Sequence, residues 1–449
     1  MTECTAGGIT FSSVDRKKLI ADFDGGHITS DAGAVLLREV DRRTGLIDAI
    51  NGCIADPRNQ EMIVHDQRTL LAQRIFGIAS GYEDLNDHQA LRDDPLFQAV
   101  TDRGIDQDVP LGSPSTLCRL ENRITRKSLF AMAKVFVDRF IASHRKPPKE
   151  LILDFDATDD RVHGDQEGRF FHGYYDHYCF LPLYVFCGDQ LLAAYLRTSK
   201  IDPSKHTRAV LKLLVERFRR IWPEVRIIVR ADSGFCRWKL MRWCDRHDVH
   251  YILGLARNAV LERLTEPYAA ESKRLFDETG EKQRLFDDLS YAAGTWDRER
   301  RVIVKAEHLK EGPNTRLVVT NLPGDPRDLY DGLYCQRGQM ENRIKEQQLD
   351  LFADRTSCHD FMANQFRLLL SAAAYVLMET LRRTSLNNTE LQHAQVGTIR
   401  LKLLKIGARV KTSVRRIVLH LATGFPLQDL FRRLAERLTA PARSHPTFT

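Results

Sequence analysis

The sequence predicts an α/β protein: a mixed β-sheet with flanking helices, preceded by a helical N-terminal domain. Two observations support this prediction. Between 147 and 258, short apolar runs rich in β-branched residues alternate with amphipathic runs of helical periodicity, as expected for strands joined by crossover helices. Before that segment, amphipathic runs follow helix-start signals such as Ser113-Pro114, where serine caps the helix and proline takes its first position.

The elements between 147 and 258 follow one another in a recognisable order. A strand is followed by a hairpin around Gly188, and then helices and strands alternate. The predicted elements are a strand at 151–156, hairpin strands at 178–187 and 191–197, a helix at 205–222, a strand at 225–231, a helix at 237–247 and a strand at 249–256. An antiparallel hairpin joined to parallel crossovers is the order of an RNase H-like core.

Composition shifts divide the chain into five regions. The Pro-Pro turn at 147–148 marks the first boundary. The predicted regions are a helical DNA-binding domain at 1–146, the first part of an RNase H-like catalytic core at 147–258, a β-rich insertion at 259–330, the helical part of the core at 331–385, and a basic helical C-terminal region at 386–449. The apolar run at 368–378 is too short to span a bilayer and predicts a buried helix, so no membrane partner is expected.

Positive charge is concentrated in two segments. The net charge is +7, and residues 391–449 alone carry eleven basic against two acidic residues. Residues 109–149 carry nine basic against two acidic residues. Such segments favour a polyanion, here double-stranded DNA, although a solvated helix face would show the same excess. Arg119 and Arg123 are predicted to lie in a DNA groove, the alternative being a plain bundle helix.

Cysteine usage and the first residues indicate a cytoplasmic protein. Nine cysteines occur without a C-x-x-C pair, and the chain begins with polar, glycine-rich residues. These features favour reduced thiols and no signal peptide. A P-loop sequence is absent, which argues against ATP use. His163, His172 and His177 lack metal-ligand spacing and are predicted to serve loop or DNA-contact roles.

Three acidic residues, far apart in sequence, are candidate metal ligands. Asp156 and Asp232 each end an apolar run that predicts a buried strand, and Glu341 lies in a polar helical segment. Alternation places Asp154 and Asp156 on one face of the first strand, where buried carboxylates need a counter-charge. Carboxylates arranged in this way hold two Mg²⁺ or Mn²⁺ ions about 4 Å apart and cleave phosphodiesters. Asp154 is the alternative ligand, and a lone aspartate at a strand end also serves as a turn cap.

The segment around Glu341 has a distinctive helical stripe. At 100° per residue, five side chains fall within roughly 80° of arc: Tyr334, Arg337, Glu341, Lys345 and Gln348. Neither a core face nor an ordinary solvated face favours an aromatic hydroxyl, a guanidinium, a carboxylate and an ammonium together. The stripe therefore predicts a face that holds metal and contacts DNA.

Here the chain resembles the DDE transposases of bacterial insertion sequences, in the branch with a β-rich insertion and the signature Y-x2-R-x3-E-x6-K. Tyr334, Arg337 and Glu341 match the signature, whereas Gln348 stands where the family has lysine. Similar also are Asp-Ala-Thr at 156–158, Ala-Asp-Ser-Gly-Phe at 231–235 and Arg-Asn at 257–258. The resemblance covers about 150–385.

The resemblance implies an activity and a set of roles. The family's enzymes bind terminal inverted repeats, cleave DNA with metal ions and transfer strands in cut-and-paste transposition. Asp156, Asp232 and Glu341 would hold two Mg²⁺ ions. Tyr334, Arg337, Lys345 and Gln348 would contact DNA, with Lys345 taking over from the missing signature lysine.

The resemblance further implies a homodimer in the synaptic complex and a cytoplasmic bacterial protein that associates with the nucleoid when bound to DNA. Two alternatives stay open. One is an RNase H-like nuclease or resolvase without strand transfer; the other is a catalytically inactive DNA-binding regulator.

Overall fold

The alternation of side chains in β4 (Glu150–Ala157) sets the centre of the fold. The computed structural model describes residues 8–105 and 109–440. Leu151, Leu153 and Phe155 turn to one face of β4 and enter the main hydrophobic core. Ile152 packs against a smaller apolar cluster on the other face. Asp154 and Asp156 share the face of Ile152, because strand residues two apart point the same way.

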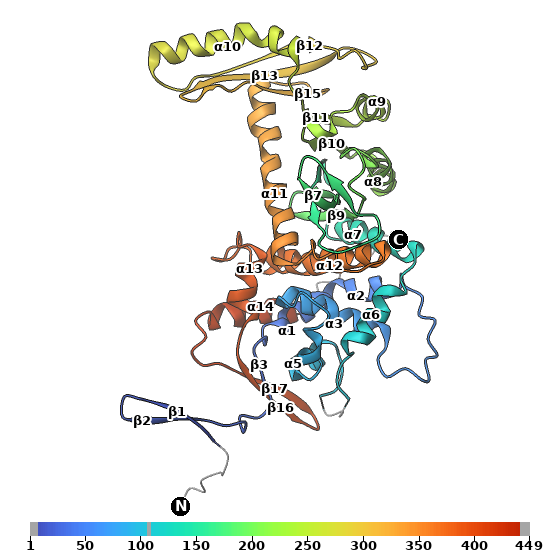
Figure 1. Cartoon of the computed structure of the whole chain (residues 1–449), viewed down its shortest axis with the longest axis vertical. Coiled ribbons are helices and arrows are strands. Elements are labelled where there is room, and N and C mark those ends of the chain that lie inside the picture. The colour runs from blue at the N-terminus through green and yellow to red at the C-terminus, as the bar shows by residue number, and fades with distance from the viewer. Residues whose placement is uncertain (1–7, 106–108, 441–449) are drawn as a thin grey trace, which may run out of the picture. The chain divides into compact units, whose positions relative to one another are not determined.

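β4 lies in the middle of a long mixed sheet (Figure 1), whose strand order is β12-β13-β15-β11-β10-β4-β8-β9. β10 pairs in parallel with both β4 and β11, whereas β8 pairs antiparallel with β4 and β9. The other strands are β8 Leu183–Cys187, β9 Gln190–Tyr195, β10 Arg226–Ala231, β11 His250–Gly254, β12 Arg284–Tyr291, β13 Arg300–Leu309, β14 Gly312–Pro313 and β15 Arg316–Thr320. A small separate sheet has the order β5-β7-β6, formed by Asp160–Arg161, His177–Phe180 and Phe170–His172.

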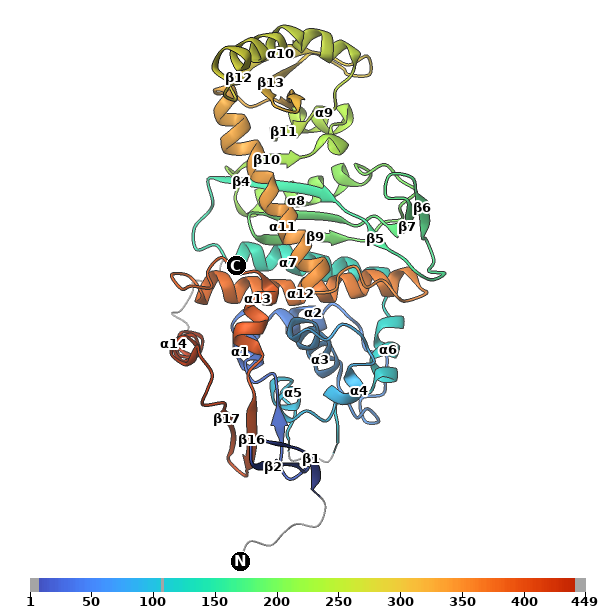
Figure 2. The same ribbon diagram turned by 60° about the vertical axis from the view of Figure 1, so that its left-hand side comes forward.

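Helices cover both faces of this sheet. Apolar side chains of α7, α8 and α9 enter the main core with Leu151, Leu153 and Phe155. The segment that contains α11 runs along the opposite face (Figures 1 and 2). The bounds are α7 Arg126–Ala142, α8 Thr207–Ile221, α9 Trp238–Arg246, α10 Ala259–Thr279, α11 Gly338–Lys345 and α12 Phe361–Ser385. Asp154 and Asp156 therefore face the α11 side of the sheet.

The segment at 259–330 extends the sheet, whereas the sequence predicted an interruption of the core. It begins with the 21-residue helix α10 and continues into β12, β13 and β15. β15 pairs antiparallel with β11, the last core strand, through Ile252, Leu253 and Gly254. The segment thus holds one long helix and four strands, β12 to β15. Its pairing was missed because strand neighbours are set by side-chain packing between distant segments, which local periodicity does not report.

The chain divides into two compact units, which differ from the predicted regions. One unit comprises residues 1–47, 56–120 and 380–449, and the other comprises 48–55 and 121–379. The predicted N-terminal and C-terminal regions thus contribute to a single unit. Residues 1–7, 106–108 and 441–449 of these regions lie outside the described residues.

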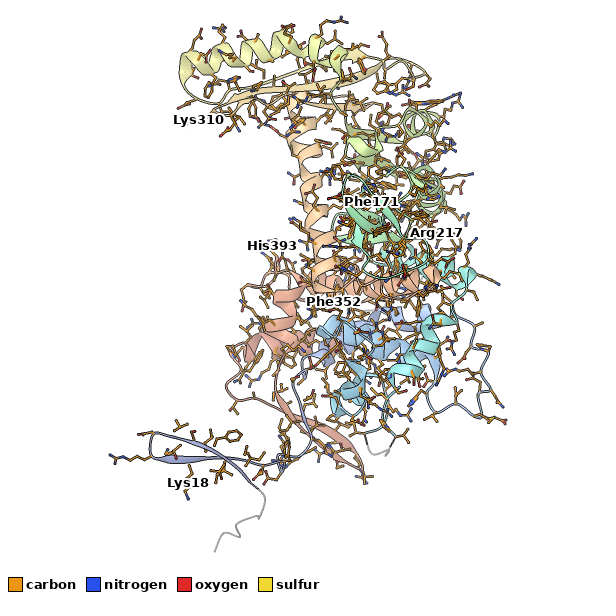
Figure 3. All side chains as sticks on the ribbon, in the orientation of Figure 1. Lys18, Phe171, Arg217, Lys310, Phe352 and His393 are labelled. Atoms are coloured by element: carbon orange, nitrogen blue, oxygen red, sulfur yellow. The ribbon has the colours of Figure 1, made fainter. Side chains whose placement is uncertain are left out.

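The first unit mixes helices with short strands, whereas the sequence predicted helices at both ends of the chain. A hairpin, β1 with β2, precedes the helices, and Figure 3 labels Lys18 on it. In the C-terminal segment, β16 and β17 form a hairpin that pairs with β3. The strands are β1 Ile9–Val14, β2 Lys17–Ala21, β3 Ile28–Thr29, β16 Ala408–Ser413 and β17 Arg416–Leu421. The helices of this unit, and those shared with the second, are α1 Ala34–Thr44, α2 Leu46–Asn51, α3 Gln67–Ser80, α4 His88–Leu91, α5 Pro95–Val100, α6 Pro114–Asn122, α13 Val396–Ile399 and α14 Gln428–Thr439.

The C-terminal hairpin was missed because its strands carry many charges. Arg409, Lys411 and Arg416 alternate with apolar residues there, and the same residues fit a basic helix face. Ala408 and Val410 are both buried, and Ala408 packs in a small core cluster with Ala32 and Ile406. Burial of alternate residues, a period of two, is the signature of a strand with one face on a core.

α12 is the one helix among the described residues that is long and apolar enough to cross a membrane by length and composition. It contains the apolar run 368–378, and 78% of its 18-residue apolar window is buried. Burial of this kind is typical of a core helix, as the sequence predicted for this run.

Candidate active site

The parallel pairing of β10 with β4 brings two of the predicted acidic residues together. Phe155 pairs with Ala231, so Asp156 and Asp232, each one residue further on, lie at the same edge of the sheet. Asp232 follows the last residue of β10 and caps a short 3-10 turn, where its Oδ1 accepts a hydrogen bond from the Gly234 N–H at 2.9 Å. Asp232 therefore caps a turn and also lies beside Asp156, so the turn-cap role does not exclude a place in the site.

Asp156 lies in a crowded electrostatic environment. Its Oδ1 accepts a hydrogen bond from the Ala157 N–H at 2.9 Å, and its Oδ2 lies 3.3 Å from Arg337 Nη1. Burial raises the pKa of Asp156 to about 7; Arg337 opposes this shift, whereas Asp232 and Glu341 add to it. Asp232 and Glu341 therefore both lie within electrostatic range of Asp156.

Glu341 comes from α11 and is the most accessible of the three. Its side chain is 46% exposed, and its Oε1 lies 2.7 Å from Arg337 Nη2. Arg337 thus contacts both Asp156 and Glu341. Glu341 and Arg337 are four residues apart, a spacing that places side chains on one face of a helix.

Asp154, the alternative ligand, has a different partner. Arg230, directly opposite on β10, binds it through Nε at 2.5 Å and Nη2 at 2.7 Å, and both side chains are buried. Arg230 Nη1 also donates to the Leu333 carbonyl at 2.6 Å. The counter-charge that buried Asp154 was predicted to need is therefore a guanidinium, and the choice of Asp156 over Asp154 as the ligand on β4 stays a prediction.

The segment with the predicted stripe is not a uniform α-helix. A π turn spans 328–334, a 3-10 turn spans 335–337, α11 spans 338–345, and a second π turn spans 346–350. These turns rotate successive residues by different angles from the 100° of an α-helix. The 100° repeat assumed for the stripe therefore does not hold through the two π turns, which contain Tyr334 and Gln348. Arg337 and Glu341 share a face, and the Tyr334 hydroxyl lies beside Gly254 at the end of β11.

Gly254 is a site residue that was not predicted from the sequence. A Cβ at this position would lie 2.6 Å from the Tyr334 hydroxyl and 2.8 Å from the Ser233 backbone nitrogen. The close approach needs a residue without a side chain. The available signal was a glycine at the end of an apolar strand, which often marks a close backbone or ligand approach.

Gln348 points into the protein and contacts the segment after β4. Its Nε2 donates to Asp160 Oδ1 at 2.9 Å and to the Asp159 carbonyl at 3.0 Å. Asp160 is fully buried, and this burial raises the pKa of its carboxyl well above the ordinary range. The Gln348 amide supplies this buried carboxyl with a hydrogen-bond donor. In this structure Gln348 binds these protein groups, and its DNA-contact role stays a prediction.

Replacing Gln348 by alanine is expected to lower the free energy of unfolding by about 1–3 kcal/mol, because Asp160 and the Asp159 carbonyl lose their donor in a buried place. Gln348→Lys, which introduces the family's residue, should retain more of the stability, since its ammonium offers Asp160 a donor. Urea unfolding followed by circular dichroism measures both changes. Gln339→Ala, an exposed change on α11, is the control and should stay within about 0.5 kcal/mol of the unchanged protein. Equal losses in Gln339→Ala and Gln348→Ala would contradict the assignment.

Three other residues predicted to contact DNA differ in their exposure to solvent. Lys345 is exposed at the end of α11. Arg119 is exposed on α6, whereas Arg123 follows the last residue of α6 and is only partly exposed. A DNA-contact role for each of the three stays a prediction. Among the three histidines, His177 has a defined contact, since its Nε2 lies 2.7 Å from Asp159 Oδ2.

Carboxylate oxygens are the donors that Mg²⁺ prefers, so Asp156, Asp232 and Glu341 fit a divalent cation by their chemistry. Across residues 8–105 and 109–440, however, no three His, Cys, Asp or Glu side chains converge closely enough to form a ready metal site. Arg337 lies against two of the three acids in this structure. The donor set is therefore present, and a guanidinium supplies the positive charge.

Comparison with known proteins identifies the family of the chain. No curated protein matches the chain. Among solved structures, the chain is similar to one described as a cryo-EM structure of the piggyBac transposase synaptic complex with hairpin DNA, at 11% identity and a TM-score of 0.39, covering 92% of this chain and 83% of that one. The family model described as transposase DDE domain, group 1, matches residues 11–442, nearly the whole chain. The chain therefore belongs to this family of DDE transposases.

Proposed function

We propose that the chain is the transposase of a bacterial insertion sequence, which binds the terminal inverted repeats and moves the element by cut-and-paste cleavage and strand transfer. The observation that carries the proposal is the grouping of Asp156, Asp232 and Glu341, three acids from distant parts of the chain, around one guanidinium. The strand order β9-β8-β4-β10-β11, with β8 antiparallel and β10 and β11 parallel to β4, supports an RNase H-like core beneath them.

Each acid has a role in this proposal. Asp156 and Asp232 hold divalent cations at the sheet edge, and Glu341 completes the set from α11. Bound Mg²⁺ or Mn²⁺, as two ions, would lower the pKa of the attacking water or 3′-OH and stabilise the leaving oxygen. Tyr334, whose hydroxyl lies against Gly254, shapes the floor of the site and lies within electrostatic range of Arg337.

DNA is the partner in this proposal. Lys345, exposed one turn beyond Glu341, is placed to contact a phosphate near the cleaved strand, and a lysine there positions DNA without reading its sequence. Two copies of the chain, one for each element end, would form the synaptic complex. The proposed location is the bacterial cytoplasm, on the nucleoid when DNA is bound.

The test uses the DNA that flanks the coding region. The full-length chain, Mg²⁺ and a labelled fragment with the flanking inverted repeat should yield a 3′-OH end, and that end should then join to a plasmid. Cleavage without joining would favour a nuclease or resolvase. Binding without cleavage would favour an inactive regulator. No binding and no cleavage would sink the proposal.

DNA binding should weaken steeply as the salt concentration rises. Substitutions in the basic C-terminal hairpin test whether this hairpin contacts DNA phosphates. Arg409, Lys411, Arg415 and Arg416 are exposed on or beside β16 and β17. Replacing all four by glutamine is expected to flatten the slope of log K against log salt by about 0.9 for each phosphate that the hairpin no longer neutralises. Gel-shift titrations from low to physiological salt measure the slope.

The control for this experiment removes the same charge elsewhere. Arg263, Lys273, Arg274 and Lys282 are exposed on or just after α10, and their replacement by glutamine should leave the slope unchanged. Substitution is preferred to deletion of the C-terminal segment, because Leu403, Leu404 and Leu434 are buried and deletion would open the core. Equal flattening in both quadruple variants would argue that the effect reflects net charge alone.

A further inference from the structure

Arg337 occupies an unusual position for a residue predicted to contact DNA. Its Nη1 lies 3.3 Å from Asp156 Oδ2, and its Nη2 lies 2.7 Å from Glu341 Oε1. Asp232 also acts on it electrostatically. One guanidinium therefore contacts two of the three carboxylates that the proposed function assigns to metal ions, and it lies within electrostatic range of the third.

The arrangement follows from the backbone and is not a chance surface contact. Arg337 and Glu341 are four residues apart at the start of α11, so the helix presents them together. The side chain of Arg337 is only 20% exposed, and that of Asp156 is 15% exposed. In such a half-buried place a charge pair is screened much less than at the surface. The contact thus has energetic weight, unlike most exposed ion pairs.

The contact of Arg337 with the two acids would oppose the binding of a divalent cation. A divalent ion bound by Asp156 and Glu341 would meet the positive charge of Arg337 at a few Å, and like charges at that distance repel strongly. Arg337 already contacts one oxygen of each of these carboxylates, Asp156 Oδ2 and Glu341 Oε1. The guanidinium and the ion would therefore compete for the same two carboxylates.

We propose that Arg337 is an internal competitor of the metal ions, which holds the acids of the site together before assembly and must leave them when the ions bind. The released guanidinium, on the same helix face as Glu341, is then available to a phosphate of the bound DNA strand. Arg337 is in this sense a positioning residue that delays full metal loading until DNA offers it another anion. This inference rests on the proposed function of the site.

The first test measures cation binding without DNA. Isothermal titration of full-length protein with Mn²⁺ should show a tenfold or greater gain in affinity for Arg337→Gln, because a repelling charge has been removed. Arg337→Lys keeps the positive charge, so its Mn²⁺ affinity should stay closer to that of the unchanged protein. Adding Asp156→Asn to Arg337→Gln should abolish the gain, because the ion loses a ligand.

The matched control is Arg274 on α10. It also contacts two carboxylates, Glu271 at 2.6 Å and Glu278 at 2.5 Å, but on an exposed helix face. Arg274→Gln should leave Mn²⁺ affinity unchanged. An equal gain in Arg274→Gln, or no gain in a folded Arg337→Gln, would overturn the inference.

A second test uses the unchanged protein, so it can be carried out even if Arg337→Gln does not fold. Phenylglyoxal modifies accessible guanidinium groups, and peptide mass spectrometry follows individual arginines. Modification of Arg337 should become several-fold faster when Mn²⁺ is added, whereas the rate at Arg274 should not change. A cation-independent rate at Arg337 would overturn the inference.

These measurements separate the inference from the proposed function. Suppose that the unchanged protein cleaves and joins DNA with Mg²⁺, that Mn²⁺ does not change the modification rate of Arg337, and that Arg337→Gln does not change the Mn²⁺ affinity. In that case only the role of Arg337 fails. If the protein binds Mn²⁺ as inferred but never cleaves DNA, the proposed function fails and the competition stands.

Discussion

Asp156→Asn, Asp232→Asn and Glu341→Gln are each expected to lower the rate of DNA cleavage by about 10³-fold or more. Each change removes a negative charge from a proposed metal ligand, and metal ions supply several kcal/mol of transition-state stabilisation, at about 1.4 kcal/mol for each tenfold in rate. DNA affinity should change little, because phosphate contacts come from lysine and arginine. Single-turnover cleavage of a labelled terminal repeat and gel-shift affinity are the two measurements.

Glu150→Gln is the matched control for the triad. Glu150 lies on the same strand as Asp156, at its other end, and forms an exposed ion pair with Arg226 at 3.4 Å. Its replacement should leave cleavage unchanged. A triad variant that still cuts at the unchanged rate would remove that residue from the catalytic set, and if this were Asp156→Asn, attention would return to Asp154 despite its pairing with Arg230.

Arg230→Met is expected to lower the free energy of unfolding by about 3–5 kcal/mol. The change leaves the Asp154 carboxylate buried without its partner, and breaking a buried ion pair from one side costs this amount. The change also removes the hydrogen bond that Arg230 donates to the Leu333 carbonyl. Urea unfolding followed by circular dichroism measures the change.

Two comparisons sharpen that experiment. The double variant Asp154→Leu with Arg230→Met should recover much of the loss, because apolar replacement of both partners of a buried pair is often neutral. Arg226→Gln, which breaks the exposed pair with Glu150, should cost less than about 1 kcal/mol. A loss in Arg230→Met no greater than that in Arg226→Gln would show that the Asp154–Arg230 pair has little energetic weight.

Periodicity alone predicted much of the central sheet. The apolar runs around Leu153 and Val229 appear as β4 and β10, and the helix predicted at 205–222 appears as α8. These elements could be predicted because burial on one or both faces leaves a local record in the order of apolar residues. The pairing of β15 with β11 left no such record, since it depends on segments far apart in the chain.

The same distinction applies to the site. By itself, the sequence determined which carboxylates end the buried strands, Asp156 and Asp232, and that Arg337 and Glu341 share a helix face, because these are properties of consecutive residues with a fixed repeat. Only the tertiary structure decided that Arg230 neutralises Asp154 and that Gln348 turns inward to Asp160. The physical reason is that such partners are chosen by strand register and by local π and 3-10 turns, and both depend on packing across the whole fold.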